Sequence, residues 1–100
     1  MLTSKQRAQL RGLASTEKTI LQIGKAGITD NTVVQANDAL RAHELIKGRT
    51  LDNCPLTPRE ACEGLAARCS AEPVQVIGSR FVLYRASDTV PPEKRIRLVR

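Results

Sequence analysis

Two glycines that flank a lysine and an alanine form the part of the sequence best suited to bind a ligand. The segment Gly24-Lys25-Ala26-Gly27 lies between a β-prone run, Thr19–Ile23, and a predicted helix that begins at Thr29 or Asp30. Glycine has no Cβ atom, so the chain can turn tightly there and a second backbone can approach it closely. Unpaired amides and the positive dipole end of the following helix favour a phosphate group. Because Lys25 adds a mobile positive charge, the segment predicts a phosphate-binding turn.

The same spacing also fits an ordinary strand-to-helix turn that simply requires glycine. The phosphate interpretation depends on context: a strand precedes the pair, a helix follows it, and Lys25 lies between the glycines. The segment is neither a Walker A loop nor the longer G-x-G-x-x-G fingerprint of dinucleotide-binding proteins. KH domains use a G-x-x-G loop to clamp a nucleotide backbone, so nucleic acid is the preferred ligand.

Four further basic residues can extend this site. Arg7 and Arg11 are four residues apart in a predicted helix and share one of its faces. Lys47 and Arg49 alternate with Ile46, Gly48 and Thr50 in a predicted strand, so both point to one face. These charges are either a solvated surface or a continuation of the binding site, and the sequence leaves both open. The predicted RNA-binding residues are therefore Gly24, Lys25, Ala26, Gly27, Arg7, Arg11, Lys47 and Arg49.

The net charge favours an acidic partner. The chain has 100 residues, which fits one domain, with 16 Lys and Arg against 10 Asp and Glu and a formal charge of +6. This positive excess favours nucleic acid or an anionic membrane as the partner. The excess basic residues lie at the two ends of the chain. The sequence has no apolar run long enough to span a bilayer. We therefore expect nucleic acid as the partner. The lack of such a run and of a signal peptide predicts a cytoplasmic protein with no membrane partner.

The residue types needed for catalysis or metal binding are not grouped in the sequence. The cysteines, Cys54, Cys62 and Cys69, have no C-x-x-C spacing, so neither a disulfide framework nor a zinc site is predicted. Cys62 and Cys69 lie on the apolar stripe of a predicted helix and are expected to be buried. His43 is the only histidine and has no nucleophile that the sequence places beside it. We expect no enzyme, no cofactor, no metal and no small-molecule substrate.

The aromatic residues exclude one mode of RNA binding. RRM and OB-type proteins stack bases on several aromatic rings. Phe81 and Tyr84 are the only Phe, Tyr or Trp residues, and their spacing on a strand directs them to opposite faces. This chain cannot build such a platform, and both rings are predicted to pack inside the fold.

Capping signals and hydrophobic periodicity predict an α-β-α-β-α-β-β order. Thr3 or Ser4 caps the first helix, which ends over residues 14–16, and Thr3 with Gln6 has capping-box spacing. The second helix begins at Thr29 or Asp30 and ends at His43-Glu44, and the third runs from Thr57, with a capping-box Glu60, to about Cys69. The strands are Thr19–Ile23, Leu45–Leu51, Val74–Ile77 and Arg80–Arg85. Alternating helices and strands predict an α/β, two-layer sandwich with a four-stranded mixed sheet. Gly78-Ser79 suits a type II′ hairpin turn.

The chain divides into a domain and a tail. Residues 1–86 hold all the predicted elements and form the RNA-binding domain. Residues 87–100 contain Pro91-Pro92 and the basic residues Lys94, Arg95 and Arg97. They lack a core-forming pattern, which predicts an extended or mobile tail that folding does not require.

Four short segments in this order resemble the CRM domain family (chloroplast RNA splicing and ribosome maturation), in its stand-alone bacterial YhbY-like form. They are Leu2-Thr3-Ser4-Lys5-Gln6-Arg7, Gly24-Lys25-Ala26-Gly27-Ile28-Thr29, Ala42-His43-Glu44-Leu45-Ile46-Lys47, and Gln75-Val76-Ile77-Gly78 with Val82-Leu83-Tyr84-Arg85. The resemblance implies a fold related to the C-terminal domain of translation initiation factor three, with RNA bound at the Gly24–Gly27 loop. One departure is Gly48, which stands where the family usually has a β-branched residue and predicts a weaker strand.

The residues and the resemblance together predict a non-catalytic, monomeric RNA-binding protein. Bacterial members of the family are associated with precursors of the large ribosomal subunit, so the resemblance implies rRNA or a pre-50S particle as the partner during ribosome assembly. The alternative is a protein-interaction adaptor on the ribosome that touches RNA only incidentally.

Overall fold

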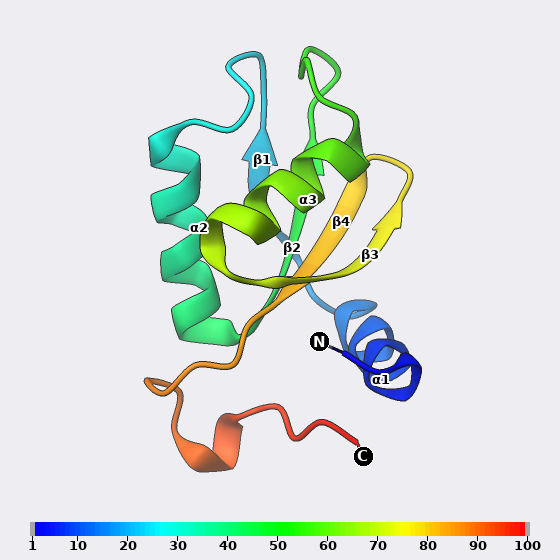
Figure 1. Ribbon diagram of the computed structural model, residues 1–100, viewed down its shortest axis with the longest axis vertical. Coiled ribbons are helices and arrows are strands. Elements are labelled where there is room, and N and C mark those ends of the chain that lie inside the picture. Colours follow the sequence, from blue (N-terminus) through cyan, green and yellow to red (C-terminus); the bar gives the residue numbers. More distant parts are fainter. Residues whose placement is uncertain (1, 100) are drawn as a thin grey trace.

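The computed structural model describes residues 2–99 and confirms the predicted order of elements (Figure 1). Within these residues, three α-helices, four strands and a short 3₁₀ helix follow one another along the chain. Their bounds are α1 Ser4–Ala14, β1 Thr19–Ile23, α2 Asp30–His43, β2 Leu45–Thr50, α3 Pro58–Cys69, β3 Glu72–Ile77, β4 Arg80–Tyr84 and η1 Pro92–Lys94.

The N-cap of each α-helix is a threonine that is among the candidates predicted from the sequence. Thr3, Thr29 and Thr57 each accept a hydrogen bond from the backbone amide three residues ahead. The side chain of that later residue accepts a hydrogen bond from the threonine's own amide, which completes a capping box. These bonds satisfy amides that the first helical turn leaves unpaired.

The four strands form one mixed sheet in the order β1-β2-β4-β3. β1 runs parallel to β2, whereas β4 pairs antiparallel with both β2 and β3. The positive φ of 56° at Gly78 agrees with the predicted type II′ turn between β3 and β4. β3 begins at Glu72, earlier than the predicted Val74, because pairing with β4 continues past an irregularity between Pro73 and Gln75.

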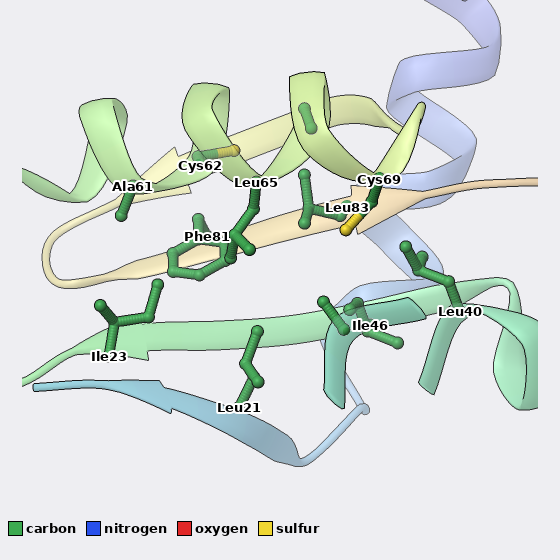
Figure 2. Packing of buried hydrophobic residues seen from close by; sticks show 12 residues of the cluster. Leu21, Ile23, Leu40, Ile46, Ala61, Cys62, Leu65, Cys69, Phe81 and Leu83 are labelled. Atoms are coloured by element: carbon green, nitrogen blue, oxygen red, sulfur yellow. The ribbon is translucent and has the colours of Figure 1, made fainter. Parts of the chain in front are cut away.

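Apolar side chains divide between the two faces of the sheet. α2 and α3 cover one face and enclose the larger core cluster, which includes Leu21, Leu65 and Phe81 (Figure 2). α1 packs across one end of the other face over a smaller cluster that includes Leu10 and Val82. The predicted α/β sandwich with its four-stranded mixed sheet is confirmed, and α1 covers part of the second face (Figure 1).

Gly48 in β2 lies opposite Phe81 in β4. A Cβ atom at position 48 would be 2.5 Å from Cζ of the Phe81 ring, too close for two carbon atoms that are not bonded. The ring therefore occupies the space that a side chain at position 48 would take. The departure from the family pattern at Gly48 predicts a weaker strand. The structure shows that the glycine leaves room for Phe81, the bulkiest fully buried side chain of the core.

Cys62 and Cys69 of α3 are buried in the larger cluster, as their spacing predicts. Burial raises the pKa of the Cys62 thiol to about 11 and also raises the pKa of the Cys69 thiol. Both thiols therefore stay protonated near neutral pH and serve as small apolar side chains.

The segment after β4, for which the sequence predicts an extended or mobile tail, packs against the domain. The buried carboxylate of Glu44 accepts hydrogen bonds from the amides of Ser87 at 2.7 Å and Ile96 at 2.8 Å. Ile96 and Leu98 pack against the smaller core cluster. In α1, Gln9 donates a hydrogen bond to the Arg97 carbonyl oxygen at 2.7 Å. The sequence pattern misses this packing because the partners on α1 and at Glu44 are distant along the chain.

Candidate nucleic-acid interface

The Gly24–Gly27 segment forms a tight turn between β1 and α2. The Gly27 amide donates a hydrogen bond to the Gly24 carbonyl oxygen at 3.0 Å. Gly27 has a φ of 68°, a left-handed conformation that favours glycine. Lys25 and Ala26 occupy the tip of the turn, where both are exposed.

The loop between β2 and α3 supports the base of this turn. A Cβ atom on Gly24 would be 3.4 Å from Cδ1 of Leu51, and one on Gly27 would be 3.6 Å from Cγ of Pro55. The Leu51 amide donates a hydrogen bond to the Ile23 carbonyl oxygen at 2.8 Å, which fixes the end of β1 beside β2. Leu51 and Pro55 therefore lie beside the two glycines, and the tip of the turn remains exposed.

Backbone amides of the turn are available to an anion. Within residues 2–99, the amides of Lys25, Ala26 and Ile28 donate no hydrogen bond. Asp30, the first residue of α2, forms an ion pair with Arg68 at 3.0 Å, so its negative charge is compensated. A phosphate at the tip would therefore meet free N–H groups and the Lys25 ammonium group.

Lys47 and Arg49 share one face of β2, as their alternation predicts, and this face points away from α2 and α3. Arg80 of β4 is the register partner of Arg49. Sequence reasoning missed Arg80, because strand register is not written in a local pattern. The available signal was its place beside Phe81, since a residue next to a core residue in a strand points to the other face.

Arg7 and Arg11 of α1 face two hollows. Together with Arg59 of α3, both line a hollow of about 520 Å³ beside β3. Arg11 also lines a hollow of about 310 Å³ with Lys47 and Arg80. α1 and the glycine turn lie at opposite ends of the sheet (Figure 1). The structure therefore brings Arg11 and Lys47 together but does not bring α1 to the turn.

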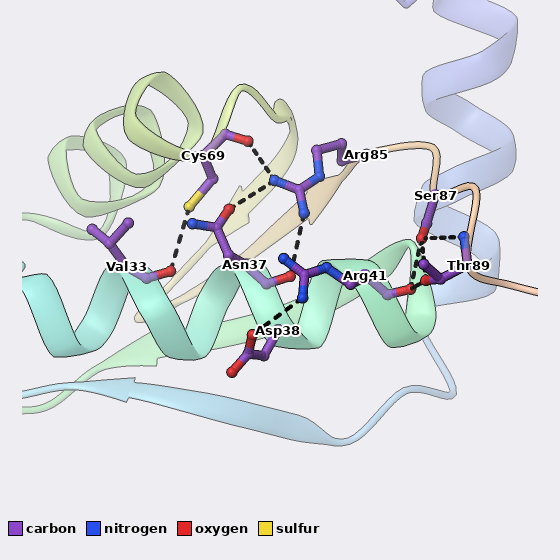
Figure 3. A network of polar contacts seen from close by, with 8 residues as sticks. All are labelled: Val33, Asn37, Asp38, Arg41, Cys69, Arg85, Ser87 and Thr89. Atoms are coloured by element: carbon purple, nitrogen blue, oxygen red, sulfur yellow. Dashed lines mark hydrogen bonds and ion pairs between the residues drawn. The ribbon is translucent and has the colours of Figure 1, made fainter.

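Other basic side chains form contacts inside the fold. Arg85 donates hydrogen bonds to Asn37 of α2 and to the Cys69 carbonyl oxygen of α3, both at 2.7 Å (Figure 3). Arg41 forms an ion pair with Asp38 at 3.9 Å. By contrast, no ion pair within the described residues involves Arg7, Arg11, Lys25, Lys47, Arg49 or Arg80. These six cations keep their charge available to a partner.

The described residues offer few other ligand-binding features. Phe81 and Tyr84 are both buried, so no Phe, Tyr or Trp ring among residues 2–99 is exposed for stacking on a base. This part of the chain has no group of three or more His, Cys, Asp or Glu side chains that could hold a metal ion. None of its helices combines the length and apolar character needed to cross a membrane.

The glycine turn after the first strand and the basic face of the mixed sheet define a small α/β domain with an exposed G-x-x-G turn. The chain belongs to the CRS1/YhbY (CRM) domain family, whose family model matches residues 2–85. The family predicted from the sequence motifs is thus confirmed.

Relatives of the chain match it over most of their length. A Bacillus subtilis protein named probable RNA-binding protein YqeI is 41% identical over 87 residues, covering 87% of this chain and 91% of the relative. A Haemophilus influenzae protein named RNA-binding protein is 32% identical over 99 residues, covering 99% and 96%. A hypothetical protein from Staphylococcus aureus, whose solution structure is titled as that of a candidate RNA-binding protein, has a TM-score of 0.75 and 45% identity. That match covers 88% of this chain and 92% of the other.

Proposed function

We propose that this protein is a non-catalytic RNA-binding protein that contacts structured RNA through the Gly24–Gly27 turn. The observation that carries the proposal is the tip of the turn, where an exposed Lys25 stands beside backbone amides that have no partner within the described residues. Free N–H groups and a cation suit a phosphate oxygen. The basic side chains of Arg7, Arg11, Lys47 and Arg49 extend the contact beyond the turn.

The proposed partner is rRNA of the large-subunit precursor, bound by a monomer during ribosome assembly. Two of the relatives are named RNA-binding proteins or probable RNA-binding proteins, which supports RNA as the ligand. Side chains cannot read the deep, narrow major groove of an A-form helix, so contacts go to phosphates, 2′-hydroxyls and shape. A turn that offers amides and a lysine fits this kind of contact better than it fits base reading.

Replacing Lys25 and Ala26 by aspartate in one variant tests the proposal. Both glycines remain, so the turn should form and the melting temperature should stay close to that of the parent. Affinity for protein-free rRNA from large subunits should fall by roughly 10- to 100-fold, because a phosphate contact is lost and two negative charges face the backbone. The measurement is a titration of labelled RNA beside a thermal melt.

A matched control variant changes the net charge by the same amount at a site far from the turn. Arg41→Asp with Ala42→Asp alters two exposed residues near the other end of α2 and should retain most of the affinity. If the Lys25→Asp/Ala26→Asp protein melts normally and binds RNA like the parent, the turn has only a structural role. A parent protein with no affinity for rRNA would favour the adaptor role.

A further inference from the structure

One row of side chains crosses the open face of the sheet near the glycine turn. Gln22 of β1, Arg49 of β2, Arg80 of β4 and Ile77 of β3 are successive register partners. Gln22, Arg80 and Ile77 are exposed, and Arg49 is half-buried. α1 covers only the far end of this face, so the row remains open to solvent.

Arg49 and Arg80 of this row lie directly opposite each other on neighbouring strands, and the described part of the fold offers no ion-pair partner for either charge. Like charges directly opposite on neighbouring strands are destabilising, and neither Arg49 nor Arg80 forms an ion pair within the described residues. The Nε atom of Arg49 is buried without a hydrogen-bond partner. Buried polar groups are normally bonded, so this donor lacks the acceptor that an external ligand could supply.

The hollow next to this row is lined by cations. We call it the sheet hollow: it has a volume of about 310 Å³ and is lined by Arg11, Ala14, Ser15, Lys47, Gln75, Ile77, Arg80 and Val82. Its lining contains three basic side chains and no carboxylate. Two other hollows differ in this respect. The hollow of about 520 Å³ beside β3 includes Glu63 in its lining. A hollow of about 330 Å³ beside the start of β2, lined in part by His43 and Lys47, includes Glu17.

The end of α1 that borders the sheet hollow is also compatible with an anion. The C-terminal carbonyl groups of a helix carry partial negative charge. Here the Gly12 carbonyl oxygen accepts a hydrogen bond from the Ser15 hydroxyl at 2.7 Å, and the Leu13 carbonyl oxygen accepts one from the Thr16 hydroxyl at 3.1 Å. These bonds, together with Arg11 in the last turn, offset the negative end of the helix.

We propose that the sheet hollow and the adjacent Arg49 form a second phosphate-binding site, which holds a phosphodiester group of the RNA bound at the glycine turn. This inference rests on the proposed function and adds a second contact point to it. The Arg80 and Lys47 side chains supply charge from the sheet, and Arg11 supplies it from α1. A phosphate oxygen beside Arg49 and Arg80 compensates the like charges that the strand register places opposite each other. Because the aromatic rings are buried, the face contacts the backbone and not the bases.

Two variants of the full chain, Arg80→Thr and Arg49→Thr, test this site. Threonine suits a strand, so both should fold. Each lost phosphate contact should reduce the magnitude of the slope of log K against log salt by about 0.7 to 0.9. The loss of affinity should be equal for oligouridylate and oligoadenylate of the same length. Removing one of two opposed charges should raise the melting temperature by roughly 1 to 6 °C.

The control is Arg41→Gln, which removes one positive charge from the other side of the molecule and should leave the slope unchanged. A separate measurement uses inorganic pyrophosphate as the probe. It should raise the melting temperature of the parent and of Arg41→Gln, and have a smaller effect on Arg80→Thr and Arg49→Thr.

The outcomes separate this site from the glycine turn. If the Lys25→Asp/Ala26→Asp protein loses RNA while Arg80→Thr and Arg49→Thr keep the parental affinity and slope, the second site is refuted and the proposed RNA contact at the glycine turn stands. If Arg80→Thr melts below the parent and Arg80→Lys restores stability without any change in RNA affinity, Arg80 is a structural residue and the inference falls. If the turn variant binds normally, the proposed function itself fails.

Discussion

Gly48 and Phe81 face each other across β2 and β4, and the contact makes each residue depend on the other. Gly48→Val would place its Cβ within the space of the ring, where the distance to Cζ is 2.5 Å for an ideal Cβ. Overpacking of this kind costs about 1 to 3 kcal/mol. We expect the variant to melt at a temperature lower by several degrees, measured by circular dichroism.

A double-mutant cycle identifies the cause. Phe81→Leu alone should also destabilise the protein, since it leaves a cavity beside Gly48. Gly48→Val combined with Phe81→Leu should be more stable than the sum of the single changes predicts, because a branched side chain then fills the space. Additive effects would show that the ring and position 48 are independent.

The segment after β4 packs against the domain through contacts that the sequence pattern does not predict. A chain that ends at Ala86 loses the packing of Ile96 and Leu98, and it leaves the buried Glu44 carboxylate without the Ser87 and Ile96 amides. Leaving a buried acceptor unsatisfied costs about 1 to 3 kcal/mol. We therefore expect a lower melting temperature, and weaker RNA binding because the basic residues of the tail are also removed.

Glu44→Gln in the full-length chain provides the milder comparison. It keeps one acceptor oxygen and should destabilise the protein less than the truncation does. A truncated protein that melts at the parental temperature would restore the expectation of a tail that folding does not require.

The elements that the sequence predicted well are those with local signals. The capping boxes at Thr3 and Thr57 occur where the sequence predicts them, because each box depends on residues only three apart. For the second helix the sequence left the N-cap at Thr29 or Asp30, and the structure has it at Thr29. The early start of β3 and the docking of the tail depend on partners far along the chain, such as Glu44 for Ile96. Local periodicity cannot report such partners.

The candidate site also combines features that local spacing predicts with features that depend on distant partners. The glycine turn and the shared face of Lys47 and Arg49 follow from local spacing. The Arg49–Arg80 pairing and the hollow shared by Arg11, Lys47 and Arg80 arise only when α1 and two strands are assembled.

For the whole molecule, the formal charge of +6 and the six unpaired cations described above predict binding that weakens strongly with salt. Each phosphate that the protein neutralises releases counterions, so about four contacts give a slope of log K against log salt near −3. The measurement is a series of rRNA titrations from roughly 50 to 300 mM salt. A slope near zero would contradict electrostatic binding of RNA.

The distribution of these charges affects how quickly the protein meets its partner. On α2 and α3 the exposed carboxylates of Asp30, Asp38, Glu60 and Glu63 offset the exposed cations of Arg41, Arg59 and Arg68, whereas the hollow on the opposite face of the sheet has a basic lining without a carboxylate. A polyanion therefore attracts one side of the molecule more than the other and turns that side toward itself before contact. Such steering increases the association rate constant and leaves dissociation largely to the short-range contacts. Added salt should then lower the association rate constant more than it raises the dissociation rate constant.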